Sequence, residues 1–280
     1  MRLTMGWRWS SIVVAQAGGG TETAGTASMC IPGHKATRSG LAVGVVAELW
    51  RYPVKSMLGE QCGQVLMEDR GIAGDRLYAV RDGEGKFGSG KNTRRFRRID
   101  GLPGFRARYD GIIPVVTFPD GHQVRGDDPL ADQHLQCALR RADVGLAREA
   151  GVSHFDQAPV HLITDASLSW LAAAVPDVQV DARRVRPNLV LRTGRLAALI
   201  EDAWVGRTAR IGRSAVVEFT HRTERCVMIN NAQDGLAHSS QVLRAVAKEN
   251  EMMLGIYAKV IRPGTVRLGD EMLLMDGLLE

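Results

Sequence analysis

Short, frequent β-like runs are the feature that most limits what this chain can fold into. From Val43 onward, brief apolar stretches alternate with turn signals such as Asp82-Gly83, Asp110-Gly111 and Pro119-Asp120-Gly121. Runs of this length separated by glycine-containing turns are typical of strands in a barrel or a sandwich. A doubly wound sheet would instead show strands alternating regularly with helices. The sequence therefore predicts a mainly β (α+β) fold with a few helices.

The expected elements fall into two β-rich halves that meet around Gly151–Pro159. Helices are expected after Thr164 or Asp165 and after Ser239 or Ser240, because these residues cap helix N-termini. Further elements are a helix at Pro129–Leu139 and strands at Val43–Trp50, Gln64–Met67, Arg76–Val80, Phe105–Tyr109, Pro114–Phe118, Val160–Thr164, Leu189–Leu191, Glu201–Gly206, Ala209–Ile211, Val216–Thr220, Val227–Ile229, Leu254–Ile261, Thr265–Leu268 and Glu271–Met275. We predict one domain over residues 41–150 and a second over residues 151–280.

Residues 1–40 have a different composition from the rest of the chain. Gly18–Ser28 is small, polar and rich in glycine, which is typical of a linker. The apolar run Ile12–Ala15 is shorter than the ~7 residues that the apolar core of a secretory signal needs. We therefore interpret residues 1–40 as a disordered tail, or as the product of an upstream start codon, rather than as an export signal.

Composition and charge exclude several classes of protein. Apolar residues make up 45% and charged residues 24% of the chain, and no run approaches the ~20 apolar residues of a membrane helix. The net charge of +5 suits a small anionic ligand and is too small by itself to indicate nucleic acid. The cysteines, Cys30, Cys62, Cys137 and Cys226, form no C-x-x-C pair, which favours a reducing compartment and a cytoplasmic protein.

Cys226 is the first candidate for chemistry. It stands between Arg225 and an apolar run, and nearby positive charge stabilises a thiolate as a soft metal ligand or a nucleophile. In a regular strand, Cys226 would share a face with Arg222 and Glu224, while His221 would point to the other face. This parity disfavours a Cys–His nucleophilic pair and leaves a metal-thiolate role open. The alternative is a buried structural cysteine, a common fate of free Cys.

Two further strings carry groups suited to a phosphorylated heterocycle. In Arg186-Pro187-Asn188, arginine can grip a phosphate with two hydrogen bonds and asparagine can pair with a heterocycle edge. The alternative is a solvated basic turn, which we favour for Arg183. Tyr52-Pro53-Val54-Lys55-Ser56 and Gly74-Asp75-Arg76 place other cations near predicted strands. Taken alone, Lys55 would be expected at the surface, as most lysines are, and Arg76 would be expected to pair with Asp75.

The arginine-rich segment Arg94–Arg98, preceded by Gly88-Ser89-Gly90-Lys91, admits several interpretations. A basic run with one aromatic residue can bind single-stranded nucleic acid, but the glycine spacing is not that of a phosphate-binding loop. We favour a solvated loop, with the rim of a cofactor site as the second interpretation. The histidines show no metal-ligand spacing and are expected at the surface or with satisfied nitrogens: His122, His134, His154, His161 and His238.

Together, the strings around Lys55, Arg186 and Cys226 resemble one known family. The chain is similar to MOSC-domain proteins that carry a MOSC N-terminal β-barrel, from about Val43 to about Met275. This group includes the C-terminal part of molybdenum cofactor sulfurase and the amidoxime-reducing component. The resemblance implies a β-barrel-like module followed by a MOSC β-barrel domain, with a molybdopterin-type molybdenum cofactor in the cleft between them. The family also bears the label of pyridoxal phosphate binding, and we infer no bound pyridoxal phosphate from it.

The resemblance also implies roles for particular residues. Cys226 would be the metal ligand and the catalytic residue, and the cofactor would be held by Lys55, Ser56, Arg76, Arg186, Asn188 and Arg225. The implied activity is the reduction of N-hydroxylated or N-oxide compounds. Some relatives carry a fused ferredoxin domain, and the chain has no iron–sulfur spacing, so electrons would come from a separate ferredoxin-, flavin- or cytochrome-type reductase.

Other functions stay open at this point. A non-redox module could hold or deliver the molybdenum cofactor without reducing a substrate. A cofactor-free thiol enzyme or sulfur carrier could use Cys226 directly. A nucleic-acid role through the arginine-rich segment is the least favoured, and neither a nucleic-acid nor a membrane partner is expected.

Overall fold

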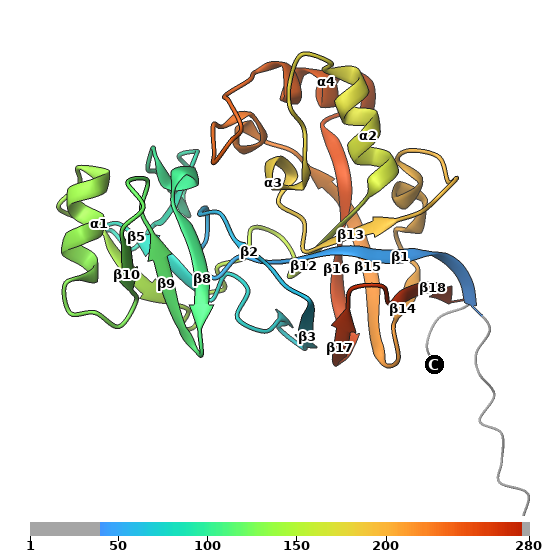
Figure 1. Cartoon of the computed structure of the whole chain (residues 1–280), viewed down its shortest axis with the longest axis horizontal. Coiled ribbons are helices and arrows are strands. Elements are labelled where there is room, and N and C mark those ends of the chain that lie inside the picture. The colour runs from blue at the N-terminus through green and yellow to red at the C-terminus, as the bar shows by residue number, and fades with distance from the viewer. Residues whose placement is uncertain (1–39, 276–280) are drawn as a thin grey trace, which may run out of the picture. The chain divides into compact units, whose positions relative to one another are not determined.

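A computed structural model describes residues 40–275 of the chain (Figure 1). Of the tail predicted over residues 1–40, all but Gly40 lies outside the described residues, as does the segment 276–280. The described part consists mainly of strands with four α-helices, so the mainly β fold predicted from the sequence is confirmed.

Seven strands of the main sheet close into a barrel. Neighbouring strands are hydrogen-bonded in the order β13, β12, β16, β15, β14, β18 and β1, and β1 also pairs with β13 to complete the ring. Alternate side chains point inward and form one apolar core, which includes Leu162, Phe219 and Ile256. The bounds are β1 Gly40–Arg51, β12 Val160–Thr164, β13 Leu189–Arg192, β14 Thr208–Ile211, β15 Ala215–Glu224, β16 Met253–Arg262 and β18 Glu271–Met275.

Strand β1 joins the early part of the chain to this barrel. It pairs with β18 and β13, and its end pairs with β2 (Glu60–Gln61). Close to its start, a Cβ on Gly44 would approach the carbonyl oxygen of Arg192 to 2.5 Å, so only glycine fits there. Late in the chain, β17 (Gly264–Arg267) pairs with β3 (Gln64–Glu68). Both connections cross the predicted boundary at residue 150, which itself stays a prediction.

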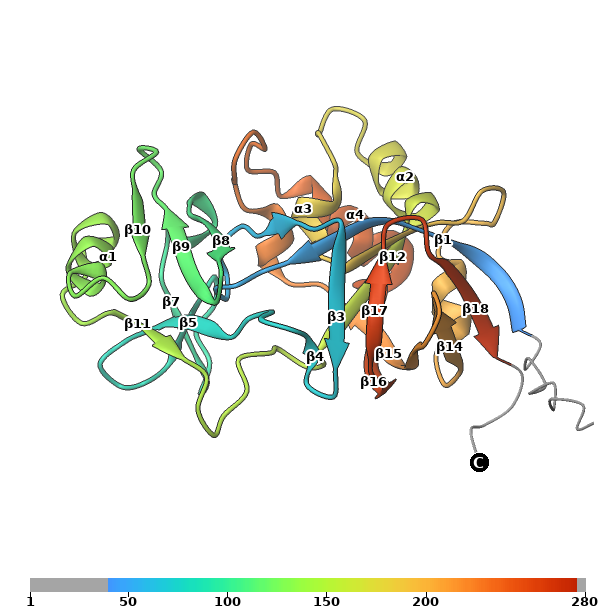
Figure 2. The ribbon, with the colours of Figure 1, turned by 60° about the horizontal axis from the view of Figure 1, so that its bottom comes forward.

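The remaining strands of the N-terminal part form small sheets around a second core (Figure 2). Phe105, Val116 and Leu135 are among the side chains buried there. Strand β4 (Gly71–Ile72) is the exception, because it pairs with β3 and its Ile72 side chain lies in the barrel core. The other elements are β5 Tyr78–Arg81, β6 Phe87–Ser89, β7 Phe96–Arg98, η1 Leu102–Gly104, β8 Arg106–Asp110, β9 Ile113–Thr117, β10 Gln123–Arg125, α1 Ala131–Leu139 and β11 Gly145–Arg148.

The helices of the second half begin close to where the sequence predicts. Helix α2 (Asp165–Ala174) is capped by the Thr164 side chain, which accepts a hydrogen bond from the backbone N–H of Ser167. Helix α4 (Gln241–Asn250) follows Ser240, whose side chain makes no capping bond. The short helix α3 (Ala182–Val185) was not predicted; it begins at Asp181, whose side chain accepts from the backbone N–H of Arg183.

Two strand predictions are wrong. Val227–Ile229 begins η3 (Val227–Asn230), a 3₁₀ turn that buries Ile229 and leaves Val227 41% exposed. Glu201–Gly206 lies mostly in η2 (Ile200–Trp204), where the buried Glu201 carboxylate accepts hydrogen bonds from the hydroxyls of Thr164 and Ser167. In both places a 3₁₀ turn buries one side chain, Ile229 or Glu201, against residues that are distant in the sequence. A local apolar or acidic pattern does not indicate such a contact.

Candidate functional site

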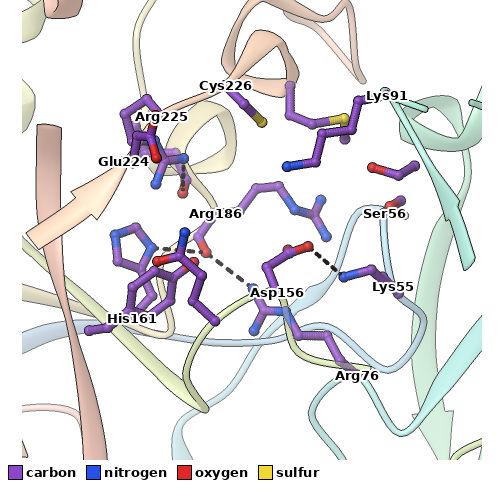
Figure 3. A pocket seen from close by; sticks show the side chains of 15 residues that line it. Lys55, Ser56, Arg76, Lys91, Asp156, His161, Arg186, Glu224, Arg225 and Cys226 are labelled. Carbon is purple, nitrogen blue, oxygen red and sulfur yellow. Dashed lines mark hydrogen bonds and ion pairs between the residues drawn. The ribbon is translucent and has the colours of Figure 1, made fainter. Parts of the chain in front are cut away.

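One cavity collects most of the residues that the sequence singled out (Figure 3). Its volume is about 180 Å³, which exceeds by more than tenfold the ~10–15 Å³ that a cavity needs to hold one water molecule. It therefore accommodates a small molecule or one end of a larger one. The lining residues are Lys55, Ser56, Arg76, Ser89, Lys91, Asp156, Gln157, His161, Val185, Arg186, Glu224, Arg225, Cys226, Met228 and Tyr257.

Cys226 lies at the point where strand β15 gives way to η3. The strand ends at Glu224, and Cys226 stands in extended conformation as the residue before the 3₁₀ turn. Glu224, Arg225 and Cys226 all line the cavity, so the alternation expected of a regular strand is wrong here. Register shifts between Phe219 and His221 and between Arg222 and Glu224 break that alternation. Figure 3 shows the thiol pointing into the cavity.

Lys55 and Ser56 come from the turn that follows β1. The Lys55 side chain is only 3% exposed, and its ammonium group donates to the carboxylate of Asp156 (2.9 Å) and to the carbonyl of His154 (2.8 Å). Burial lowers the pKa of Lys55, and the charge of Asp156 opposes this effect only in part. The Ser56 hydroxyl donates to the carbonyl of Gly88 at 2.9 Å, which ties this turn to β6.

Arg76 is held by a fixed carboxylate. Its guanidinium group forms an ion pair with the fully buried Asp75 and also donates to the side-chain oxygen of Asn188 at 3.2 Å. It lies 4.6 Å from the centroid of the Tyr52 ring. Burial acts to lower the pKa of Arg76, but Asp75 and the other negative groups nearby outweigh it, so the pKa is raised. Arg76 is therefore a permanently charged and well-positioned cation.

Arg186 faces the cavity with few partners. It directly follows α3, and its guanidinium carbon lies 4.4 Å from the centroid of the same Tyr52 ring. Within residues 40–275, its side chain forms no hydrogen bond and no ion pair. Burial lowers its pKa to about 10, and the positive charge of Arg76 acts in the same direction. An anion in the cavity would relieve that unfavourable burial.

Arg225 and Asn188 occupy different positions relative to the cavity. Arg225 lines it and donates one hydrogen bond to the carbonyl of Val185 (2.7 Å), while its buried Nε has no partner among the described residues. Asn188 is fully buried behind the wall: its amide donates to the carbonyl of Trp50, and its side-chain oxygen accepts from Arg76 and from the backbone of His161. Asn188 thus positions Arg76 and His161, and its direct contact with a cofactor stays a prediction.

Three of these residues adopt a backbone conformation that side chains normally avoid. Ser56, Arg76 and Arg186 have φ angles of 67°, 48° and 54°, in the left-handed region. They are three of the seven non-glycine residues with positive φ in residues 40–275. Such conformations cost about 1–3 kcal/mol each and concentrate at functional sites. Their grouping around one cavity is an argument for function that is independent of its charge.

Several lining residues were missed by the sequence analysis. Asp156 and Gln157 belong to the connection between the two halves, and Tyr257 lies in β16 opposite His161 of β12. The expectation that His161 is exposed or satisfied is wrong, because it is 3% exposed and its Nε2 has no partner among the described residues. Burial and the nearby charge of Arg225 hold the pKa of His161 well below its usual range. No local sequence pattern marks these positions.

The cavity offers one soft metal ligand and an excess of positive charge. Among the described residues, no group of three or more histidines, cysteines and acidic residues could hold a metal ion. Cys62, Cys137 and Cys226 are free thiols there, and Cys226 is the one that reaches the cavity. A metal bound at Cys226 would need its remaining ligands from a bound molecule. The lining contains five cations and two carboxylates, which favours an anionic molecule.

Comparison with protein families agrees with the architecture. The model of the MOSC domain matches residues 149–273, and that of the MOSC N-terminal beta barrel domain matches residues 43–122. The chain belongs to the MOSC family. MOSC domains are associated in general with the binding of molybdenum cofactor, and the matched segments contain all of the cavity's lining residues.

The solved structures that the MOSC protein is similar to are distant. The YUAD protein from Bacillus subtilis is 11% identical, with a TM-score of 0.46 over 84% of this chain and 97% of that chain. YiiM from Escherichia coli is 16% identical, with a TM-score of 0.32 over 44% of this chain and 57% of that chain. YiiM from Geobacillus stearothermophilus is 14% identical, with a TM-score of 0.32 over 42% and 55%. No match was found among curated proteins. In residues 40–275, no helix has the length and apolar character to cross a membrane.

Proposed function

We propose that this MOSC protein is a molybdenum-cofactor-binding oxidoreductase that reduces N-hydroxylated or N-oxide compounds. For a hydroxylamine the balance is R–NH–OH + 2 e⁻ + 2 H⁺ → R–NH₂ + H₂O. The electrons come from a separate reductase of the ferredoxin, flavin or cytochrome type. Reduction therefore requires a centre that accepts two electrons and an opening large enough for a small substrate.

One observation carries the proposal: the Cys226 thiol opens into a cavity in which cations outnumber carboxylates. A molybdopterin-type cofactor has an anionic phosphate and brings sulfur ligands of its own, so a protein that holds it needs cations and a single further thiolate. The cavity supplies this set, with Cys226 as the thiolate and Lys55, Arg186 and Arg225 among the cations. The unpartnered Nε atoms of Arg225 and His161 are further groups that a bound heterocycle or phosphate can satisfy.

The residues would divide the work of holding the cofactor. When bound, the cofactor would supply a metal centre capable of two-electron chemistry. Arg186, with no protein acceptor, provides hydrogen-bond donors in the fixed fork that suits a phosphate. Arg76 and Lys55 keep their positions through Asp75 and Asp156, so they add fixed positive charge. Tyr52 orients the guanidinium groups of Arg76 and Arg186 with one ring.

Metal analysis of cysteine variants tests this function. The protein purified from molybdenum-replete cells is expected to contain molybdenum in stoichiometric amount, and Cys226→Ser is expected to lose the metal and the reduction of an aryl hydroxylamine. Cys137→Ser is the matched control, because Cys137 is an exposed free thiol on α1. A metal-free wild-type protein, or an active Cys226→Ser variant, would refute the proposal.

The same preparations separate the alternative functions. A non-redox carrier would contain the cofactor but would reduce no N-hydroxylated compound with any electron donor. A cofactor-free thiol enzyme would contain no molybdenum, and iodoacetamide would alkylate Cys226 readily. An oxidoreductase requires both bound metal and turnover.

A further inference from the structure

Lys91 is a cation of the cavity that forms no direct pair with a protein group. Within residues 40–275 its ammonium group makes no hydrogen bond and no ion pair, and it lies 5.3 Å from the centroid of the Phe96 ring. Its charge acts at longer range on the carboxylate of Asp156, which is itself paired with Lys55. Figure 3 shows the side chain extending into the cavity on the side where the Cys226 thiol points. The attraction between a cation and an aromatic ring is weak at a partly exposed site, so the ring of Phe96 does not replace a counterion.

The loop that carries Lys91 is fixed by hydrogen bonds. The side chain of Asn92 accepts from the backbone of Arg98 at 2.7 Å, and the Thr93 hydroxyl accepts from the backbones of Arg95 and Phe96. The backbone of Thr93 also donates to the carbonyl of Phe96. Lys91 therefore starts from an ordered backbone next to β6 and β7, and it is not part of the freely solvated loop that the sequence favours here.

Close packing places this loop beside Cys226. A Cβ on Gly90 would come within 2.4 Å of the sulfur of Met228, which belongs to the 3₁₀ turn that begins directly after Cys226. The absence of a side chain at Gly90 thus lets the loop rest against η3. As a result, Lys91 of the N-terminal half enters the cavity on the same side as the Cys226 thiol of the barrel half.

Most of the other cations of the cavity already have an acceptor. Lys55 is paired with Asp156, Arg76 with Asp75, and Arg225 with the carbonyl of Val185. Arg186 also lacks a hydrogen-bond acceptor, and the proposed function uses it for the cofactor phosphate. Lys91 is then left without a direct anionic partner on the side of the cavity to which the Cys226 thiol points.

We propose that Lys91 binds an anionic group of the substrate, so that the preferred substrates are N-hydroxylated compounds carrying a carboxylate. This inference rests on the proposed function, since it concerns the substrate reduced at Cys226. A substrate carboxylate would receive a charge-assisted hydrogen bond from Lys91 while its N–OH group faces the metal site. The loop is a specificity element that the N-terminal half contributes.

A matched pair of substrates tests the role of Lys91. The pair is an aryl hydroxylamine with a para carboxylate and the same compound with a para carboxamide, reduced with a viologen dye as electron source. In Lys91→Gln, the ratio of kcat/KM for the carboxylate over the carboxamide is expected to fall about tenfold, mainly through KM, as expected for a hydrogen bond to a charged group. Lys91→Arg should restore most of the ratio. Lys86→Gln is the control, because Lys86 is paired with Glu84 away from the cavity.

A binding measurement separates this inference from the proposed function. Benzoate binding to the purified protein, measured by calorimetry at two ionic strengths, should weaken about tenfold in Lys91→Gln and should weaken with salt in the wild type. If the wild type binds benzoate through Lys91 but reduces neither hydroxylamine, the proposed function fails and the anion site stands. If Lys91→Gln leaves both the ratio and benzoate binding unaltered, or if it loses molybdenum, the inference is overturned.

Discussion

The cavity has an N-terminal wall, formed by the lining residues within 55–91, and a barrel wall, formed by those within 161–257. The arginines of the two walls have different partners. Arg76 of the N-terminal half is paired with the fully buried Asp75, and its pKa is raised. Arg186 and Arg225 of the barrel half have only an aromatic ring or a backbone carbonyl, and burial lowers the pKa of each. On the N-terminal wall, Arg76 and Lys55 are therefore each paired with a carboxylate before any ligand binds, and Lys91 is the exception. The barrel wall keeps unbalanced positive charge, which a bound anion would neutralise.

Removing the carboxylate of the N-terminal wall should have the largest effect. Asp75→Ala would leave Arg76 largely buried without its counterion and would remove the acceptor of the backbone N–H of Tyr52, 2.8 Å away. Breaking a buried pair in this way costs about 3–5 kcal/mol. Urea denaturation should show that loss. Asp110→Ala removes an exposed pair with Arg125 and should cost at most about 1 kcal/mol. Equal losses of stability in the two variants would show that the buried pair of Asp75 and Arg76 contributes no more than an exposed pair.

The free energy of unfolding should depend on pH because a buried histidine lies in the segment that connects the two walls. His154 is fully buried, its Nδ1 lies 3.1 Å from the carbonyl of Arg76, and its carbonyl accepts from Lys55. Burial lowers the pKa of His154 to about 4 from an ordinary value near 6.5. The unfolded chain therefore binds a proton at this residue before the folded chain does. The free energy of unfolding should fall as pH decreases from about 6.5 to 4, by up to about 3 kcal/mol from this residue.

A histidine variant isolates that contribution. His154→Gln should flatten the fall in stability between pH 6.5 and 4, measured by urea denaturation at intervals of pH. Paired acids such as Asp156 and Glu149, whose pKa values are lowered, add their own loss in the acidic range, so only the difference between variant and wild type is informative. His122→Gln, with a side chain 42% exposed, is the control. An unaltered profile in His154→Gln would contradict the assignment.

The shared aromatic ring should give a smaller, local effect. Tyr52 donates its buried hydroxyl to the carbonyl of Pro187 at 3.0 Å, and its ring faces both Arg76 and Arg186. Tyr52→Phe keeps the ring and should cost about 1 kcal/mol in urea denaturation, with molybdenum retained. Tyr52→Leu removes the ring and should lower the molybdenum content as well. Retention of molybdenum in Tyr52→Leu would show that the ring does not position the arginines.

The sequence predicted the strands that carry this site more accurately than it predicted the arrangement of their side chains. Strands β12 and β18 have the predicted bounds, because their apolar runs and flanking turn residues are local signals. The strings around Lys55, Arg76, Arg186 and Cys226 indicated the residues that now line one cavity. The alternation expected around Cys226 failed, because bulges in β15 depend on the pairing with β16.

Contacts between distant segments were beyond the reach of the sequence. Asp156 and Lys55 are 101 residues apart in the chain and meet only in the folded structure. Lys91 approaches Cys226 because Gly90 packs against Met228, residues that are far apart in the chain. The entry of β1 into the barrel likewise depends on pairing with β13 and β18. Long-range packing, which no local periodicity encodes, determined each of these features.

The smallest expected effect on stability comes from the pair that joins the walls. Asp156→Asn keeps an oxygen that can accept from Lys55, and the Asp156 side chain is 50% exposed, so the loss of stability should be about 1 kcal/mol or less. Removing the carboxylate also raises the net positive charge of the cavity. Phosphate should therefore stabilise cofactor-free Asp156→Asn against heat more than it stabilises cofactor-free wild type, at matched ionic strength. If phosphate stabilised both proteins equally, the net charge of the cavity would not govern anion binding. The unbalanced positive charge of the barrel wall would then be no evidence for an anion site.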